Sequence, residues 1–330
     1  MLLYIKNKKK KSDVIKMEQK YETVGKMRYI ARNIMDLIGN TPMIKISNMT
    51  SEDYATIYAK LEWYNVGGSI KDRMALYIIE DAEMSGKLNR EKTIIEATSG
   101  NTGIAYAMIA AVKKYKIKIV MPESVSIERR KIIKAYGAEL VLSPGERGTA
   151  GAIELKKKML SEEPDKYVDL DQFKNQHNIL ANYMTTGKEI IEQTEGKVDM
   201  VVAGIGTAGT SVGISKRMKE YNKDIKIVGI VPKLGICIQG LRNPKDSFPT
   251  ELYDEKYFDE IIEISGDNIT ESFKMARELA KKEGLFVGMS SAVAMYVAKD
   301  KAKELGKDKN IVVIFPDNGD KYLSSCLFEE

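Results

Sequence analysis

The 330-residue chain is 43% hydrophobic and 30% charged, which is enough for one large or two medium globular domains. Its formal net charge of +5 comes from residues 1–26, where eight lysines face three acidic residues, and the rest has 44 basic and 44 acidic residues. This balance argues against a nucleic-acid partner, and no apolar run reaches the roughly 18 residues that span a membrane. The chain has only two cysteines, which argues against a disulfide framework and a cysteine metal site, so we expect a reducing, cytoplasmic compartment. His177 is the only histidine, which argues against a histidine metal site and Ser-His-Asp catalysis.

Residues 1–33 are expected to form an N-terminal extension that is flexible in part. The run KNKKKK within it is typical of a solvated tail. The apolar stretch MLLYI before that run is too short for a signal peptide. Met17 and Met27 are alternative starts, so the true start and the role of residues 1–26 stay open.

After this extension, short β-rich segments alternate with helical patterns. Strands are predicted in YATIYAKLE, KTIIEA, KIKIVMPES, ELVLSP, VDMVVAGIG, IKIVGIVP, EIIEIS and KNIVVIFPDNG. Helices are predicted after Lys71, after Gly103, through IERRKIIKAYG, through GAIELKKKMLSEE, after GIG and through ESFKMARELAKKEG. This alternation is typical of an α/β fold on parallel sheets, where ligands bind outside the carboxyl ends of the strands.

The segment NVGGSIKDRM places Lys71 in the first turn of a predicted helix. Ser69 is a good N-cap, and Asp72 completes an S-x-x-D capping box. The helix dipole disfavours a cation at that end, so the pKa of Lys71 is predicted to be lowered. Two interpretations stay open from this segment alone: a side chain that points into solvent, or a neutral amine held for a Schiff base or proton transfer.

The segment EATSGNTG follows the next strand. Its small hydroxyl residues around Gly100 can present donors to a carboxylate, and Asn101 can donate to a ring oxygen. The same residues could equally form an Asx-type turn with an N-cap.

The segment GIGTAGT carries the pattern G-x-G-x-x-G as Gly204, Gly206 and Gly209, after a strand and before a helix. A nicotinamide-binding site would also have an acid at the end of the next strand, which here ends in Pro232 and Lys233. A phosphate cradle is favoured over the nicotinamide site, because backbone N–H groups and hydroxyls gather at a helix N-terminus. A tight turn that binds nothing is the third interpretation.

Together, a lysine suited to a Schiff base, a phosphate cradle and a loop for an anion predict pyridoxal 5′-phosphate holding an amino acid. The segments that carry these features resemble the cysteine synthase and cystathionine β-synthase family of fold-type-II pyridoxal-phosphate enzymes. The resemblance covers nearly the whole chain after about residue 34, in the segments IMDLIGNTPMIKI, KLEWYNVGGSIKDR, EATSGNTGIAYA, MPESVSIERRKIIKAYGAELVLS, DQFKNQHN, TTGKEI, GIGTAGT, GLFVGMSSAVA and IVVIFPDNGDKYLSS.

The resemblance implies a role for each matching residue. Lys71 would form the internal aldimine, Asn101 would contact the 3′-oxygen of the cofactor ring, and Ser290 would face its pyridine nitrogen. The phosphate would be held by Gly206, Thr207, Ala208, Gly209 and Thr210. The α-carboxylate of the amino-acid substrate would be bound by Thr98, Ser99, Gly100, Thr102 and Gln172.

The resemblance also implies the architecture: two doubly wound α/β domains with parallel sheets and the cofactor in the cleft between them, as in the tryptophan-synthase-β-like fold. The smaller domain is expected over 65–175 and the larger over 34–64 plus 176–330. A homodimer is expected from the family. Whether a partner enzyme docks at the site stays open.

The activity that the resemblance implies is β-replacement or β-elimination through an α-aminoacrylate, which makes or breaks the Cβ–S bond of cysteine. One version joins sulfide to O-acetylserine. The other consumes L-cysteine, releases sulfide and adds water or a thiol, giving serine, lanthionine or cystathionine. The alternatives are a non-catalytic or regulatory binding protein on the same fold and an NAD-dependent oxidoreductase.

The chain departs from the family pattern near the expected substrate entrance. Residues 235–260, GICIQGLRNPKDSFPTELYDEKYFDE, replace a shorter, glycine-rich loop, which leaves the leaving group and the nucleophile open. A carboxylate of this segment could activate water or a second amino acid, or could lie in solvent. The candidates for that role are Glu251, Asp254 and Asp259.

Overall fold

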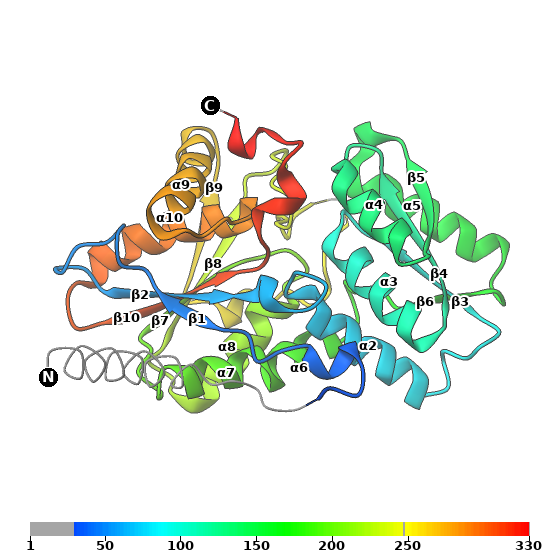
Figure 1. Cartoon of the computed structure of the whole chain (residues 1–330), viewed down its shortest axis with the longest axis horizontal. Helices are drawn as coiled ribbons and strands as arrows, with labels where there is room; N and C mark the ends of the chain where they lie inside the picture. The colour runs from blue at the N-terminus through cyan, green and yellow to red at the C-terminus, as the bar shows by residue number, and fades with distance from the viewer. Residues whose placement is uncertain (1–29, 247, 330) are drawn as a thin grey trace, which may run out of the picture.

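The computed structural model describes residues 30–246 and 248–329, so the prediction for residues 1–33 lies almost wholly outside the described part. Figure 1 shows two sheets side by side, each covered by helices. The larger sheet has six strands in the order β1-β2-β10-β7-β8-β9. Their bounds are Met43–Lys45 (β1), Thr56–Leu61 (β2), Asn310–Phe315 (β10), Met200–Gly204 (β7), Lys226–Pro232 (β8) and Glu260–Ile264 (β9).

The smaller sheet has four parallel strands in the order β5-β4-β3-β6. Their bounds are Glu139–Ser143 (β5), Lys116–Pro122 (β4), Thr93–Ala97 (β3) and Tyr167–Asp169 (β6). The chain segment from β3 to β6 therefore forms one sheet, and the segments before and after it form the other. The domain limits at residues 65 and 175 stay a prediction.

Nine α-helices lie in the described part: Lys71–Met84 (α2), Asn101–Lys113 (α3), Ile127–Ala135 (α4), Gly148–Glu162 (α5), His177–Met184 (α6), Thr186–Gln193 (α7), Gly209–Tyr221 (α8), Asp267–Glu283 (α9) and Met289–Leu305 (α10). Short 3₁₀ turns join them: Ile34–Leu37 (η1), Glu62–Tyr64 (η2), Gly145–Arg147 (η3), Glu255–Tyr257 (η4), Gly319–Tyr322 (η5) and Cys326–Phe328 (η6). None of these described helices is long and apolar enough to cross a membrane.

Helices cover both faces of the larger sheet, which explains why its central strands are almost purely apolar. In β10, Val313 packs in a cluster with side chains of α9 and α10, while Val312 packs in a cluster with residues of α7 and α8 on the opposite face. Strands buried on both sides lose the alternation of apolar and polar residues that an exposed sheet shows. The doubly wound α/β architecture is therefore confirmed.

The sequence missed several short elements. Strand β1 runs antiparallel to β2, so the larger sheet is mixed rather than wholly parallel. Strand β6 has three residues, and α6 and α7 have eight each, lengths at which periodicity gives little signal. Helix α10 begins within Gly288–Ser291, the segment before which the sequence indicates an extended stretch and after which it indicates a helical pattern, and it is largely buried along its length.

The order of the strands explains the position of the site. Strands β2, β10 and β7 are parallel neighbours, so the chain leaves all three at the same edge of the larger sheet. The segments that follow them carry Lys71, Asp317 and Gly206 respectively. In the smaller sheet β3 and β6 are also parallel neighbours, and they are followed by Ser99 and Gln172. Residues that lie far apart in sequence thus meet where the two sheets face each other.

Candidate active site

Lys71 is the first residue of α2, as predicted, but the expected capping box does not form. The N-cap is Ile70, one residue later than expected, and its backbone is already helical. Ser69 Oγ accepts a hydrogen bond from the Lys71 backbone N–H at 3.2 Å. Asp72 reaches back to the turn instead, where its Oδ2 accepts from the Gly67 N–H at 2.5 Å. The shift of one residue breaks the spacing that the box requires.

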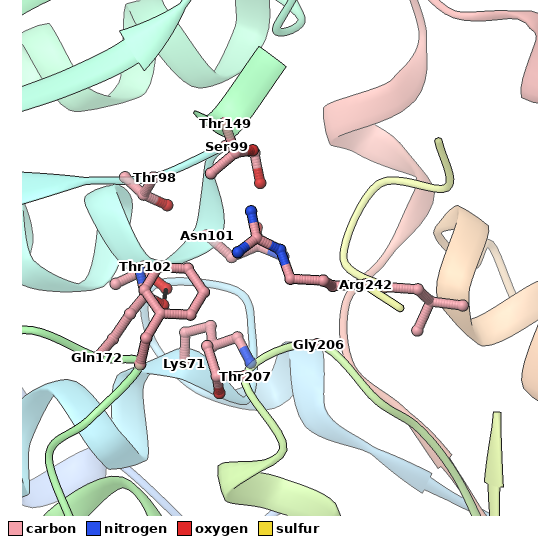
Figure 2. A pocket seen from close by; sticks show the side chains of 12 residues that line it. Lys71, Thr98, Ser99, Asn101, Thr102, Thr149, Gln172, Gly206, Thr207 and Arg242 are labelled. Atoms are coloured by element: carbon pink, nitrogen blue, oxygen red, sulfur yellow. Dashed lines mark hydrogen bonds between the residues drawn. The ribbon is translucent and has the colours of Figure 1, made fainter. Parts of the chain in front are cut away.

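The amine of Lys71 points into a pocket between the two sheets (Figure 2). Burial lowers the pKa of Lys71 from 10.5 to about 8, and the nearby Asp317 carboxylate opposes that decrease. A lowered pKa was predicted from the helix dipole, whereas the main cause is removal of the ammonium from water. At slightly alkaline pH, a substantial share of this lysine is therefore the neutral amine.

The loop between β3 and α3 forms one wall of the pocket. Thr98, Ser99, Asn101 and Thr102 line it, and Gln172 joins them from the segment after β6. Thr98 Oγ1 accepts from the Gly100 N–H at 3.0 Å, which holds the turn of the loop. Gly100 has a φ of +154°, and an added Cβ would lie 2.3 Å from the Arg129 side chain. The loop thus depends on glycine and presents small hydroxyl groups at the start of a helix.

Asn101 faces both the pocket and the larger sheet. Its Nδ2 donates to Asp317 Oδ2 at 2.7 Å. Its buried Oδ1 has no hydrogen-bond partner among the described residues. Buried polar atoms in native proteins are nearly always paired, so this unpaired atom indicates a place for a polar ligand.

The segment from Gly206 to Thr210 lies opposite, between β7 and α8. Thr207 is held by Asn178, whose Nδ2 donates to its Oγ1 at 2.9 Å. A Cβ on Gly206 would lie 2.6 Å from the carbonyl oxygen of Gly240, and one on Gly209 would lie 2.0 Å from Asn178 Oδ1. The hollow beside this segment shares Lys71, Gly206 and Thr207 with the main pocket, and Ala208 and Thr210 also line it. The cradle therefore opens directly towards the lysine.

Ser290 lies in the first turn of α10 and is buried. A Cβ on Gly240 would lie 3.3 Å from Ser290 Oγ, so this serine sits directly beneath the segment that begins the unusual loop. Its predicted contact with a pyridine nitrogen stays a prediction.

The three loop carboxylates lie elsewhere. Among the described residues that line the two hollows, none is Glu251, Asp254 or Asp259. Glu251 pairs with Lys174, Asp254 pairs with Lys256, and Asp259 lies 2.7 Å from Lys219. The geometry therefore gives no support to a role in activating a nucleophile, because each carboxylate faces a surface lysine instead of the pocket.

Arg242 is the charged residue of this loop that lines the pocket, and the sequence analysis did not single it out. Figure 2 shows its guanidinium reaching across the pocket towards Ser99 and Asn101. It lies 4.9 Å from the centre of the Phe173 ring, and its Nη1 donates to the carbonyl oxygen of Phe248 at 2.6 Å. Thr149 and Leu241 complete the lining. The departure of residues 235–260 from the family pattern was the one signal that could have pointed to Arg242.

These residues fit pyridoxal phosphate. Backbone N–H groups at the start of α8 and the Thr207 and Thr210 hydroxyls suit a phosphate, and the glycines leave no room for side chains there. The amine of Lys71 suits an aldehyde, and the unpaired Asn101 Oδ1 marks a polar position beside it. The hollow that these residues line lies directly beside the lysine.

The fold and the site together define a pyridoxal-phosphate-dependent enzyme. Residues 34–317 match the family described as pyridoxal-phosphate dependent enzyme, and the chain belongs to that family. It is 44% identical to a cysteine synthase of Staphylococcus aureus (strain N315) over 304 residues, which are 90% of this chain and 96% of that protein. It is 42% identical to cysteine synthase B of Escherichia coli (strain K12) over 293 residues, 89% of this chain and 95% of that protein.

Solved structures agree with this assignment. A hydrogen sulfide-producing enzyme from Fusobacterium nucleatum superposes with a TM-score of 0.84 at 40% sequence identity, covering 89% of this chain and 100% of that one. The family membership bears on two of the alternatives that the sequence left open. It supports a phosphate cradle in GIGTAGT over a nicotinamide site, and an enzyme over a non-catalytic binding protein.

Proposed function

We propose that this enzyme makes or breaks the Cβ–S bond of cysteine by β-replacement or β-elimination on an amino acid that carries a β-leaving group. The observation that supports this proposal most directly is the surroundings of Lys71. The loop after β3, which suits an anion, lies on one side of it, and the segment between β7 and α8, which suits a phosphate, lies on the other. The relatives named cysteine synthase and the structure described as a hydrogen sulfide-producing enzyme support the same chemistry in its two directions.

Each wall of the pocket has a task in this proposal. The hydroxyls of Thr98, Ser99 and Thr102, with the N–H groups that begin α3, bind the α-carboxylate of the substrate. Pyridoxal phosphate, when bound, supplies the aldehyde and the electron-accepting ring. Lys71 then moves the proton at Cα, because its lowered pKa leaves a neutral amine available as a base near neutral pH.

The wall of the pocket that holds Arg242 favours a second anionic group. Arg242 carries a positive charge there, and burial lowers its pKa while the nearby Asp246 carboxylate opposes that decrease. A guanidinium binds carboxylate or phosphate through paired N–H groups. We therefore propose that the leaving group or the nucleophile is anionic, as a second amino acid would be through its carboxylate.

The deciding experiment incubates the purified, cofactor-loaded protein with L-cysteine alone and, separately, with O-acetyl-L-serine plus sulfide. Sulfide release from cysteine, with serine or a thioether found by mass spectrometry, would assign the cysteine-consuming direction. Cysteine formation without sulfide release would assign the biosynthetic direction. Lys71→Ala is the control. If it kept full turnover and an unchanged visible spectrum, the proposed mechanism would be wrong.

The role of Arg242 has its own test. Arg242→Gln should raise the KM for a carboxylate-bearing thiol such as cysteine more than the KM for sulfide, since sulfide has no carboxylate for the guanidinium to bind. Equal increases in the KM for cysteine and the KM for sulfide would contradict the proposed anion-binding role of Arg242. The proposal further includes a homodimer, on the strength of the family resemblance, and a cytoplasmic location, on the strength of the low cysteine content.

A further inference from the structure

Asp317 is a buried carboxylate that contacts Asn101, a residue of the pocket wall, and no role described so far uses it. It follows β10 and has no exposed surface. Its Oδ2 accepts hydrogen bonds from Asn101 Nδ2 at 2.7 Å and from the Tyr322 hydroxyl at 2.8 Å. The Arg129 guanidinium lies 3.8 Å from the same oxygen. Its Oδ1 has no partner among the described residues.

The charged groups around Asp317 come from three elements. Lys71 on α2 and Lys321 in η5 both have their pKa lowered by burial and raised in part by the Asp317 charge. Arg129 on α4 also lies over the ring of Tyr322, 4.5 Å from its centre. The carboxylate therefore lies among three basic side chains.

An ionised carboxylate only accepts hydrogen bonds, and this determines the orientation of Asn101. The two ends of an asparagine amide look nearly alike, but only the NH₂ group can face Asp317. One hydrogen of that group is used by Asp317, and the other remains for the pocket. With a neutral neighbour that can both donate and accept, either the NH₂ group or the oxygen of Asn101 could face that neighbour.

The contact also connects the two parts of the fold. Asn101 begins α3, next to the smaller sheet, whereas Asp317 follows the central strand of the larger sheet. Arg129 belongs to the smaller part as well, and Tyr322 belongs to the segment after Asp317. The carboxylate therefore holds a pocket residue of one part against the framework of the other.

We propose that Asp317 is a positioning residue, which holds the Asn101 amide with its nitrogen towards Asp317 and its oxygen free for a ligand, and which keeps a negative charge beside Lys71. This inference rests on the proposed function, because it assigns a supporting role at that same site. Through Asn101 it sets the orientation of a group that contacts the ring oxygen. Through its charge it offsets part of the effect of burial on the pKa of the lysine.

The test compares Asp317→Asn with Tyr322→Phe in the full-length, cofactor-loaded enzyme. The first removes the charge and lets the Asn101 amide turn over, whereas the second removes one hydrogen bond to the same oxygen and keeps the charge. We expect Asp317→Asn to lower kcat on the order of tenfold to a hundredfold with a smaller change in KM, since misplaced groups cost rates of this size. Tyr322→Phe should have the smaller effect.

Two readouts separate positioning from a merely structural role. The pH midpoint of the visible cofactor absorbance should move to lower pH in Asp317→Asn and stay in place in Tyr322→Phe, because only the first removes negative charge. In the background of Asn101→Ala, Asp317→Asn should cause little further loss of kcat, since the residue it positions is gone. If Asp317→Asn does not fold, Asp317→Ser undergoes the same comparison.

An unmoved absorbance midpoint together with additive losses of kcat would overturn the inference. This failure differs from that of the proposed function, which would appear in the wild-type protein as an absent cofactor absorbance or an absence of turnover. A wild-type enzyme that turns over, beside an Asp317→Asn variant that behaves like it, leaves the proposed function standing and removes only the role of Asp317.

Discussion

The hydroxyl of Thr102 donates a hydrogen bond to Gln172 Oε1 over 2.7 Å, and so joins the loop after β3 to the segment after β6. Gln172 is held in turn, since its Nε2 donates to the Ala97 carbonyl oxygen at 3.3 Å. Because Thr102 has only one hydroxyl hydrogen, it cannot donate to a substrate carboxylate while this bond persists. In the binding mode proposed above, Thr102 therefore exchanges the Gln172 oxygen for the substrate carboxylate as its acceptor.

Replacement of Thr102 by valine should consequently weaken substrate binding. Valine has nearly the same shape but cannot donate to the carboxylate, and a hydrogen bond to a charged group contributes about 1.5–3 kcal/mol. We expect the KM for the amino acid to rise by at least about tenfold, measured by initial rates at saturating second substrate. Thr102→Ser keeps the hydroxyl and should stay close to wild type. Equal KM values for the valine and serine variants would contradict a role for the hydroxyl.

A second prediction concerns the pH dependence of cofactor uptake. The pKa of Lys71 is lowered to about 8, so the reactive neutral amine is scarce below pH 7 and predominates above pH 9. In cofactor-free protein, the rate at which Lys71 captures pyridoxal phosphate should rise with pH and level off above a midpoint near 8. Stopped-flow absorbance measures this rate.

Nα-acetyllysine in solution is the control, and its reaction should keep rising towards its own pKa of about 10.4. A midpoint for the protein close to that of the free amino acid would show that burial does not activate Lys71. Lys71→Ala should lose the pH-dependent signal.

The phosphate cradle gives a third prediction. Ala208 has a φ of +69°, a left-handed conformation that costs a residue with a Cβ roughly 1 kcal/mol. Ala208→Gly should relieve that strain and leave cofactor affinity near wild type. Gly206→Ala should lower the affinity, because its Cβ would lie 2.6 Å from the Gly240 carbonyl oxygen and displace the segment over Ser290. Both affinities follow from fluorescence or absorbance titration with pyridoxal phosphate. A cradle that tolerates Gly206→Ala would contradict this close packing.

The sequence predicted the fold and most of the candidate site because the informative residues are local. Lys71, the loop around Gly100 and the segment GIGTAGT each combine a strand, a turn and a helix start within ten residues, and the structure brings them into one pocket. The eight predicted strands are all present, and in the central ones the apolar runs reflect burial on both faces.

The residues that the sequence missed depend on contacts between distant segments. Asp317 and Asn101 are 216 positions apart, and nothing in the segment PDNG indicates which side chain it meets. Arg242 belongs to an irregular loop without periodicity, so its direction could not be read from the pattern. The same lack of periodicity led to the choice of three carboxylates that the structure pairs with surface lysines. Similarly, the capping box failed because a shift of one residue at the helix start is below the precision of sequence patterns.

A buried ion cluster behind the lysine helix leads to the last prediction, which concerns stability in acid. Glu189 of α7 contacts Arg73 of α2 at 2.6 Å and Lys60 of β2 at 2.7 Å, so it joins α7 to both elements. It also accepts from the backbone N–H of Asn40 at 2.9 Å. Burial alone would raise the pKa of Glu189, but the guanidinium of Arg73 and the ammonium of Lys60 lower it to about 2.

The sign of the pH effect follows from this lowered pKa. The folded state holds the ionised carboxylate more strongly than the unfolded chain does, so the stabilisation is present above about pH 4.5 and is lost as the pH falls towards 2. Its size is about 3 kcal/mol, because each pKa unit corresponds to about 1.4 kcal/mol. Glu189→Gln should therefore lower the free energy of unfolding by at least this amount at pH 7, since it also leaves Arg73 and Lys60 without their shared acid.

The matched control is Glu192→Gln on the same helix, whose carboxylate is 61% exposed and faces Lys188 at 3.6 Å. An exposed pair of this kind contributes between zero and about 1 kcal/mol, so this variant should unfold nearly like wild type. The free energy of unfolding of all three proteins is measured by urea unfolding at pH 7 and at pH 3. The difference in the free energy of unfolding between wild type and Glu189→Gln should be smaller at pH 3. Closer to its pKa, the Glu189 carboxylate contributes less, so the wild-type protein loses part of the same interaction. A difference that is equal at both pH values would mean that the charge of Glu189 does not hold these elements together, and that packing around its side chain does.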